Sequence, residues 1–169
     1  MRLLFELLPE TGIAAGLSIV RPSVRGIIRK QGRVAMVHSL KYDYYKFPGG
    51  GIEPGESQVE TLIRETREEA GLTVRPDSIR EYGYVHRVQP RNDGSVFLQD
   101  NYYYLCDTES DPLSQQLDDY EQEERFTLEY VNPRLAITVN RRPDHGPKDP
   151  QMLEREARVL ECLLAEEIL

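Results

Sequence analysis

The sequence predicts a single α/β domain, and three observations support this fold class. Strand-like runs stand on both sides of a capped amphipathic helix, which favours helices layered on a mixed sheet. A second stretch with helical spacing closes the chain at 151–168. The 169 residues are 39% hydrophobic and 30% charged, which suits one globular domain with a single core.

The first part of the chain is predicted to form a hairpin that leads into a glycine-rich loop. The strand-like runs 24–29 and 34–38 flank Lys30-Gln31-Gly32, whose glycine suits a tight turn. The segment 44–47, Tyr-Tyr-Lys-Phe, then leads into the loop through Pro48.

A helix is predicted between Ser57 and Gly71. Ser57 and Glu60 have the spacing of a capping box, and Gly71 suits a left-handed C-cap. One face of this helix carries the residues expected to pack on the core: Val59, Leu62, Ile63, Thr66 and Ala70. At about 100° per residue, three glutamates share a neighbouring face: Glu65, Glu68 and Glu69. Like charges one turn apart repel, so this face needs either water or a cation, and a divalent cation is the more specific interpretation.

The loop and the helix together complete a longer pattern. It runs glycine, five residues, glutamate, seven residues, then Arg-Glu-x-x-Glu-Glu-x-Gly-Leu, over residues 50–72. This pattern resembles the Nudix box of the Nudix hydrolases. The positions in register are Gly50, Glu56, Arg64, Glu65, Glu68, Glu69, Gly71 and Leu72. Only Thr66 departs, because the family usually has an aliphatic residue there, and this change leaves the carboxylates unaffected.

The resemblance implies a fold and a chemistry. The fold would be a Nudix-type α/β/α sandwich with a mixed sheet, one domain over 1–169, in which a linker at 142–150 precedes the C-terminal helix 151–168. The chemistry would be that of a hydrolase that uses Mg²⁺ or Mn²⁺ to cleave a phosphoanhydride bond of a nucleotide. The implied metal ligands are Glu65, Glu68 and Glu69, with Glu56 and Gly50 in support. Arg64 would orient a carboxylate rather than bind substrate.

The resemblance also implies a further acid outside the box. In the family, an acidic residue about six positions before an aromatic strand position often joins the metal site. Counting back from Tyr130, in the predicted strand 126–131, selects Glu124 first and Glu121 second. A solvated acidic loop is the alternative interpretation of this segment. The general base is either a box glutamate or this later acid.

The second half of the chain supplies the remaining predicted elements. Two strands, 78–88 and 96–106, are joined by a turn-rich segment with proline, asparagine, aspartate and glycine. Asn132 caps a short helix, 133–141, with Pro133 in its first turn.

Charge and composition limit the expected partners. A formal net charge of −8 argues against polymeric nucleic acid, whereas metal ions can screen the charge of a small nucleotide. Glu6 and Glu10 interrupt the apolar N-terminal stretch, so we expect no signal peptide, no membrane association and a cytoplasmic protein. Cys106 and Cys162 are expected to be free thiols. A monomer or a homodimer fits equally.

The substrate is predicted less sharply than the chemistry. The first expectation is a small nucleoside triphosphate, including oxidised ones; the alternatives are ADP-ribose, a nucleotide sugar, a dinucleoside polyphosphate, or a nucleotide sensor without catalysis. Tyr45 and Phe47 are candidates for stacking on a base, and Arg87 for contacting a phosphate. The alternative is that these three are ordinary sheet and surface residues.

Overall fold

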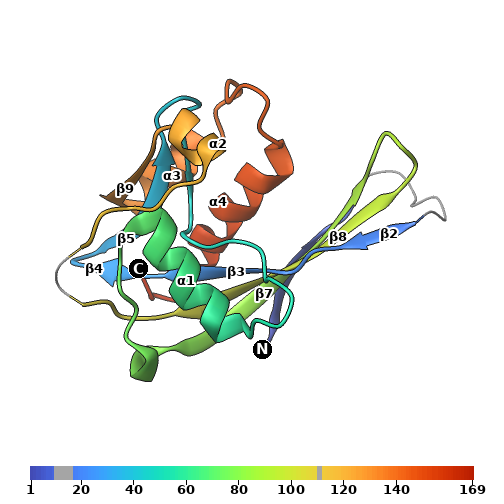
Figure 1. The fold of residues 1–169 in the computed structure, drawn as a ribbon. Helices are drawn as coiled ribbons and strands as arrows, with labels where there is room; N and C mark the ends of the chain where they lie inside the picture. The colour runs from blue at the N-terminus through green and yellow to red at the C-terminus, as the bar shows by residue number, and fades with distance from the viewer. Residues whose placement is uncertain (10–16, 110–111) are drawn as a thin grey trace.

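The computed structural model of the chain describes residues 1–9, 17–109 and 112–169. Part of the N-terminal stretch, 10–16, lies outside the described residues. Two sheets form the centre of the molecule, with helices on both sides (Figure 1). No helix in the described ranges combines the length and the apolar character needed to cross a membrane.

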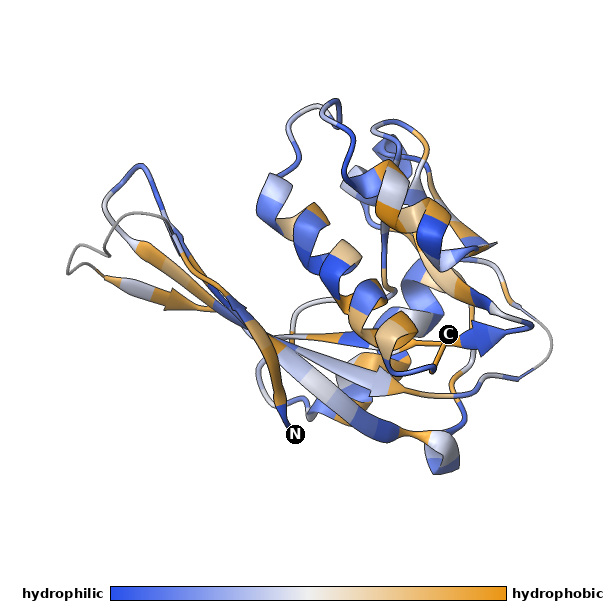
Figure 2. Ribbon diagram, turned by 180° about the vertical axis from the view of Figure 1, so that it is seen from behind, coloured by the Kyte–Doolittle hydropathy of each residue, from blue (hydrophilic) through white to orange (hydrophobic). Residues whose placement is uncertain are grey.

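The larger sheet is mixed. Its centre is the antiparallel pair β7 and β8, which runs on as a long hairpin away from the helices (Figures 1 and 2). Parallel neighbours flank this pair: β1 beside β7, and both β2 and β3 beside β8. The bounds are β1 Leu3–Leu7, β2 Ser18–Val20, β3 Ser23–Ile27, β7 Arg80–Pro90 and β8 Val96–Leu105. The predicted strands 78–88 and 96–106 are confirmed, whereas β1 and β2 were not predicted.

The smaller sheet is antiparallel and is built around β5. Its strands are β4 Arg29–Lys30, β5 Arg33–Ser39, β6 Tyr44–Lys46 and β9 Phe126–Val131. The predicted hairpin is confirmed, since Lys30 pairs with Arg33 across a turn in which Gly32 has φ 72°. The prediction of one strand over 24–29 was wrong. The chain leaves the larger sheet after β3 and enters the smaller one at β4, so this run serves both sheets.

Four α-helices and one 3₁₀ turn are present in the described ranges. They are α1 Gln58–Ala70, η1 Pro76–Ser78, α2 Asp119–Glu123, α3 Pro133–Asn140 and α4 Pro150–Ala165. The capping box of Ser57 and Glu60 and the left-handed Gly71, with φ 68°, are both confirmed. The closing helix ends three residues earlier than expected, because the chain after Ala165 turns back and Ile168 packs on the core.

Alternation along β5 divides the interior into two layers. Val34 and Met36 face the core shared with α3 and α4, whereas Ala35 faces the core shared with α1. Leu62 anchors α1 in that second core. The expected core position Val59 was wrong: it is 39% exposed in the first turn of α1. The helices thus cover opposite faces, which is the expected sandwich, and α1 presents its glutamates at an edge of it.

Candidate active site

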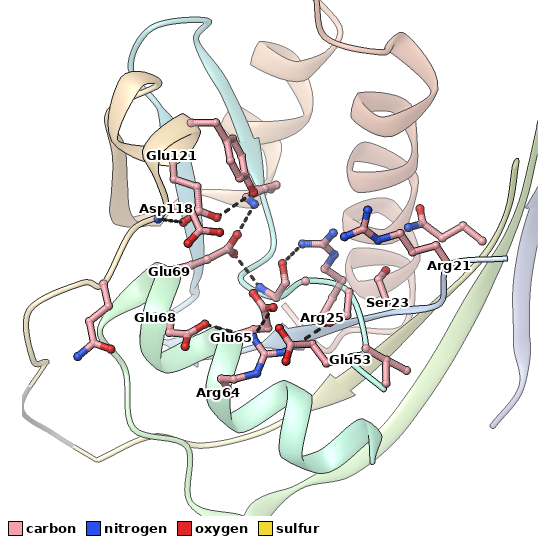
Figure 3. A pocket seen from close by; sticks show the side chains of 18 of the residues that line it. Arg21, Ser23, Arg25, Glu53, Arg64, Glu65, Glu68, Glu69, Asp118 and Glu121 are labelled. Carbon is pink, nitrogen blue, oxygen red and sulfur yellow. Dashed lines mark hydrogen bonds and ion pairs between the residues drawn. The ribbon is translucent and has the colours of Figure 1, made fainter. Parts of the chain in front are cut away.

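A cavity of about 980 Å³ lies where the glycine loop, α1, β3 and the segment before α2 meet (Figure 3). Backbone hydrogen bonds fix the loop to β3: the N–H of Val24 donates to the carbonyl of Gly50 at 2.9 Å, and that of Gly26 to Pro48 at 2.9 Å. Gly49 has φ 140°, a conformation that favours glycine. The loop therefore passes directly beneath the glutamates of α1.

Arg64 holds three carboxylates on one wall of the cavity. Its Nε and Nη2 donate to the two oxygens of Glu56 at 2.6 and 2.8 Å. Its Nη1 donates to Glu65 Oε1 at 2.7 Å and to Glu68 Oε2 at 3.2 Å. The hydrogen bonds from Arg64 lower the pKa of Glu56 to about 2, so Glu56 remains ionised. The guanidinium is thus occupied by carboxylates, and the orienting role expected for Arg64 stays a prediction.

Glu69 lies deeper and is 2% exposed. Lys46 Nζ donates to its Oε1 at 2.5 Å, and the N–H of Gly49 donates to its Oε2 at 2.9 Å. Burial alone would raise the pKa of Glu69, but the charges of Lys46 and Arg25 outweigh it and the net shift is downward. The pKa of Glu65 is raised, by burial and then by the charge of Glu69. The pKa values of Glu65 and Glu69 are thus shifted in opposite directions.

Glu121 is the later acid that reaches the cavity (Figure 3). Its oxygens accept from the Tyr120 hydroxyl and from the backbone N–H of Asp118, both at 2.9 Å. Burial, and then the charge of Glu69, raise the pKa of Glu121 to about 7. Glu121 lies in the first turn of α2, which places its side chain opposite the C-terminal half of α1 (Figure 3).

Glu124, the first choice from the sequence, points elsewhere. Its Oε2 accepts from the Tyr44 hydroxyl at 2.8 Å and from Ser39 Oγ at 3.0 Å, and its Oε1 pairs with Lys148. Glu124, the first choice, does not line the cavity, whereas the second choice, Glu121, does. Counting along the chain ignored α2, whose helical turn directs Glu121 toward α1 and leaves Glu124 packed against β5 and β6.

The three substrate-binding candidates also lie outside the cavity lining. Tyr45 stacks on His38, with ring centroids 4.2 Å apart, and its hydroxyl donates to Glu129. Phe47 is fully buried. Arg87 is buried and paired with Asp149. All three have structural contacts, and Arg87 is buried rather than the surface residue of the alternative interpretation.

The cavity instead contains residues that sequence reasoning missed. Arg21 and Arg25 approach it from the start of β3, and Phe97 and Gln99 from β8. Arg25 Nη1 donates to the backbone carbonyls of Phe47 and Gly49. A signal existed for part of this wall, because the alternation of a strand places residues 23 and 25 on one face, and Arg21 lies two residues before β3. The site therefore has a basic wall that faces the acidic one.

The donor set fits a hard divalent cation in its chemistry. Carboxylate oxygens are the ligands that Mg²⁺ and Mn²⁺ prefer, and Glu65, Glu68, Glu69 and Glu121 all line one cavity. A Cβ on Gly50 would overlap the Glu65 carboxylate, so only glycine leaves that carboxylate its room. Within the described residues, no three acidic or histidine side chains converge as a ready-made metal cluster. The oxygens of Glu65 and Glu68 are turned instead toward Arg64, and those of Glu69 toward Lys46.

Comparison with known proteins identifies a matching family model and several relatives. The NUDIX domain model matches residues 20–155. RNA pyrophosphohydrolase from Halorhodospira halophila is 43% identical over 53 residues, 31% of this chain and 29% of that protein. The asymmetrical bis(5′-nucleosyl)-tetraphosphatase from Mus musculus is 45% identical over 49 residues, 26% of this chain and 33% of that protein. The matched segment thus spans only about a third of the length of these relatives.

Solved structures show a similar fold. One, from a study of MutT from Aliivibrio salmonicida and Vibrio cholerae, has a TM-score of 0.55 and 18% identity, and covers 88% of this chain and 99% of that chain. The solution structure of the E. coli ORF135 protein has a TM-score of 0.51 and 21% identity, and covers 84% and 91%. At this identity the similarity shows the fold, and it confirms the α/β/α arrangement.

Proposed function

This chain belongs to the NUDIX domain family, and we infer from that premise and from its cavity that it is a divalent-metal-dependent pyrophosphohydrolase of small nucleotides. The observation that carries this proposal is the acidic wall of Glu65, Glu68, Glu69 and Glu121, which lies in the same cavity as Arg21 and Arg25. A polyanionic substrate needs cations on the acidic side, and it can meet the arginines directly on the other.

In the proposed reaction, the oxygen of a water molecule forms a bond to a phosphorus atom of the substrate. The P–O–P bridge to the neighbouring phosphate breaks, that phosphate leaves with the bonding electron pair, and the water proton passes to a carboxylate. A bound Mg²⁺ or Mn²⁺ would polarise the phosphoryl oxygens and make the water more acidic. Glu65, Glu68 and Glu69 would hold the metal, supported by Glu56 and the carbonyl of Gly50.

The proton acceptor is either a box glutamate or Glu121. Burial and the charge of Glu69 raise the pKa of Glu121 to about 7, which suits a base near neutral pH, because efficient proton transfer favours a value close to the working pH. Arg64 takes no proton; it fixes the rotamers of Glu56, Glu65 and Glu68. Lys46 does the same for Glu69.

For the substrate, we propose a small nucleoside triphosphate, with ADP-ribose, nucleotide sugars and dinucleoside polyphosphates as alternatives. The names of the two relatives, a pyrophosphohydrolase and a tetraphosphatase, support cleavage of a phosphoanhydride. A purely nucleotide-sensing role is less well supported, because a sensor has no need of the complete set of box carboxylates.

A phosphate-release screen tests this proposal. Purified protein is incubated with nucleoside triphosphates, ADP-ribose, nucleotide sugars and dinucleoside polyphosphates, each with Mg²⁺, with Mn²⁺, and with a chelator. We expect release of pyrophosphate or a nucleoside monophosphate from at least one substrate, only with metal, and its loss in Glu68→Gln. Saturable binding of nucleotide and metal without turnover of any compound would support the sensor instead.

A further inference from the structure

The basic wall of the cavity has a feature that the metal site does not explain. Arg21 and Arg25 stand two positions either side of Ser23, and Figure 3 shows their guanidinium groups turned toward one another. Like charges repel, and the repulsion grows in a cavity where water is partly excluded. Such an arrangement is stabilised when an anion lies between the two groups.

Both guanidinium groups have N–H donors that form no hydrogen bond within the described residues. Neither arginine has an ion-pair partner within the described part of the chain. Arg25 uses Nη1 for the carbonyls of Phe47 and Gly49, while its buried Nε has no acceptor among the described atoms. Arg21 is exposed at the mouth of the cavity, and its side chain donates no hydrogen bond to any described residue. By contrast, Arg64 in the same cavity is saturated with carboxylates.

The number of free donors and the charge fit a terminal phosphate. Guanidinium groups match phosphate oxygens in pairs, which makes arginine the preferred partner where planar recognition is needed. A terminal phosphate offers three oxygens and nearly two negative charges at neutral pH, whereas a phosphate that bridges two esters offers two oxygens and one charge. The two positive charges of Arg21 and Arg25 balance the nearly two negative charges of a terminal phosphate.

We propose that Arg21 and Arg25 form a subsite for the terminal phosphate of the substrate, opposite the metal-binding glutamates. This rests on the proposed function and narrows its small nucleotides to those that end in a free phosphate, such as a nucleoside triphosphate. The 5′-triphosphate end of an RNA presents the same terminal group and is a second source of it. Dinucleoside polyphosphates and ADP-ribose have no such end and gain less from the pair. Phe97 and Gln99, on the β8 side of Arg21, then face the part of the substrate beyond the phosphates.

Arg21→Gln is the clean variant for the test, because Arg21 has no structural contact through its side chain, whereas Arg25 also supports the glycine loop. Arg80→Gln is the matched control, an exposed arginine on β7 that does not line the cavity. Steady-state kinetics compare adenosine triphosphate, a 5′-triphosphorylated RNA oligonucleotide and diadenosine tetraphosphate.

Loss of a charge-assisted hydrogen-bond pair predicts that Arg21→Gln raises KM for the triphosphate substrates about 10- to 100-fold. We expect kcat and the KM for diadenosine tetraphosphate to change less than about threefold, and Arg80→Gln to match wild type. Whichever triphosphate is hydrolysed identifies the source of the terminal phosphate. An unchanged KM, or an equal rise for the bridged substrate, overturns the subsite.

Binding without turnover separates this inference from the proposed function. Calorimetry with imidodiphosphate, which has two terminal phosphates and resists hydrolysis, is performed with Mn²⁺ on wild type, Arg21→Gln and Arg80→Gln. We expect about tenfold or greater weakening in Arg21→Gln alone. If this is found while wild type hydrolyses nothing, the subsite stands and the catalytic proposal fails. If wild type turns over nucleotides and Arg21→Gln binds imidodiphosphate normally, the subsite fails alone.

Discussion

Arginine and lysine side chains hold the carboxylates of the site in place. Arg64 contacts Glu56, Glu65 and Glu68, and Lys46 contacts Glu69. These contacts relieve repulsion between acids that share one cavity, and they select rotamers that face it. A divalent cation competes for the same oxygens, so a metal would bind by replacing part of an existing charge balance rather than by neutralising bare carboxylates.

Substitution of two box glutamates should separate catalysis from stability. Glu68 is the more exposed, so we expect Glu68→Gln to lower kcat by about 100-fold or more with an unchanged melting temperature. Glu69→Gln should lower kcat as much and also lower stability by about 3 kcal/mol, because it leaves the buried Lys46 without its counter-charge. Steady-state kinetics and thermal melting check both. Wild-type turnover in either variant contradicts the site assignment.

Glu121 should make stability depend on pH in metal-free protein. Burial and the charge of Glu69 raise its pKa from 4.5 to about 7, so the folded state favours its protonated form. The sign follows by linkage: its contribution to stability is full below about pH 4.5 and is lost as pH rises toward 7. We expect the melting temperature of Glu121→Gln to fall less than that of wild type over this interval, measured with a chelator.

Other carboxylates in the same cavity also titrate, so wild type is compared with Glu121→Gln rather than interpreted alone. Glu65 has a raised pKa and adds the same slope to both proteins, so only the difference between them reports on Glu121. Glu56 and Glu69 have lowered pKa values and act in the opposite sense, below about pH 4.5. Parallel curves for wild type and Glu121→Gln would show that Glu121 is not the titrating group.

At the level of elements, the glycine loop leaves room for a carboxylate of α1 because Gly50 has no side chain. A Cβ on Gly50 would overlap the Glu65 carboxylate, whereas a Cβ on Gly51 would meet only the flexible end of Arg21. We therefore expect Gly50→Ala to weaken Mn²⁺ binding about tenfold or more by displacing Glu65. Gly51→Ala, one residue away, is the matched control and should bind nearly as wild type. Calorimetry with Mn²⁺ compares them; equal affinities would mean that Glu65 is not a ligand.

The short helix α2 is anchored by Glu124. This buried carboxylate joins Ser39, Tyr44 and Lys148, and so ties α2 to the smaller sheet and to the loop before α4. We expect Glu124→Ala to lower stability by about 3–5 kcal/mol, since it leaves Lys148 and two hydroxyls unpaired. Denaturant unfolding measures this. The Mn²⁺ affinity of Glu124→Ala should fall less than that of Glu121→Gln. The reverse order would indicate that Glu124, and not Glu121, belongs to the metal site.

The sequence was informative where local chemistry determines structure, and less so where distant segments meet. Capping residues and a 3.6-residue period define α1, and the box pattern places its glutamates. Whether 121 or 124 enters the cavity depends on the turn of α2 and on partners about 80 residues away. Arg25 was missed because its position depends on a glycine loop that lies 24 residues further along the chain, and Arg21 because only the folded chain brings it to the cavity. Tyr45, Phe47 and Arg87 have residue types that suit binding, but their surroundings bury them.

For the molecule as a whole, a polar network connects the closing helix with the cavity. Arg155 and Glu156 of α4 are both buried; Arg155 donates to Asn101 at 2.6 Å, and Asn101 accepts from Ser23 of the cavity wall at 2.8 Å. Glu156 accepts from the N–H of Phe47, two residues before the glycine loop. Because these groups join α4, both sheets and the loop, the site and the fold are stabilised by shared contacts.

This connection implies that metal binding should stabilise the whole fold. A ligand that binds only the native state adds RT ln(1 + [L]/Kd), about 2.7 kcal/mol at a hundredfold excess over Kd, or roughly 5–11 °C in melting temperature for a domain of this size. We expect that rise with Mn²⁺ in wild type and a much smaller one in Glu68→Gln, which lacks one donor but keeps the buried contacts. Na⁺ at equal ionic strength controls for screening. If Na⁺ matches Mn²⁺, or if Glu68→Gln responds as wild type does, the acidic wall of α1 does not bind the ion.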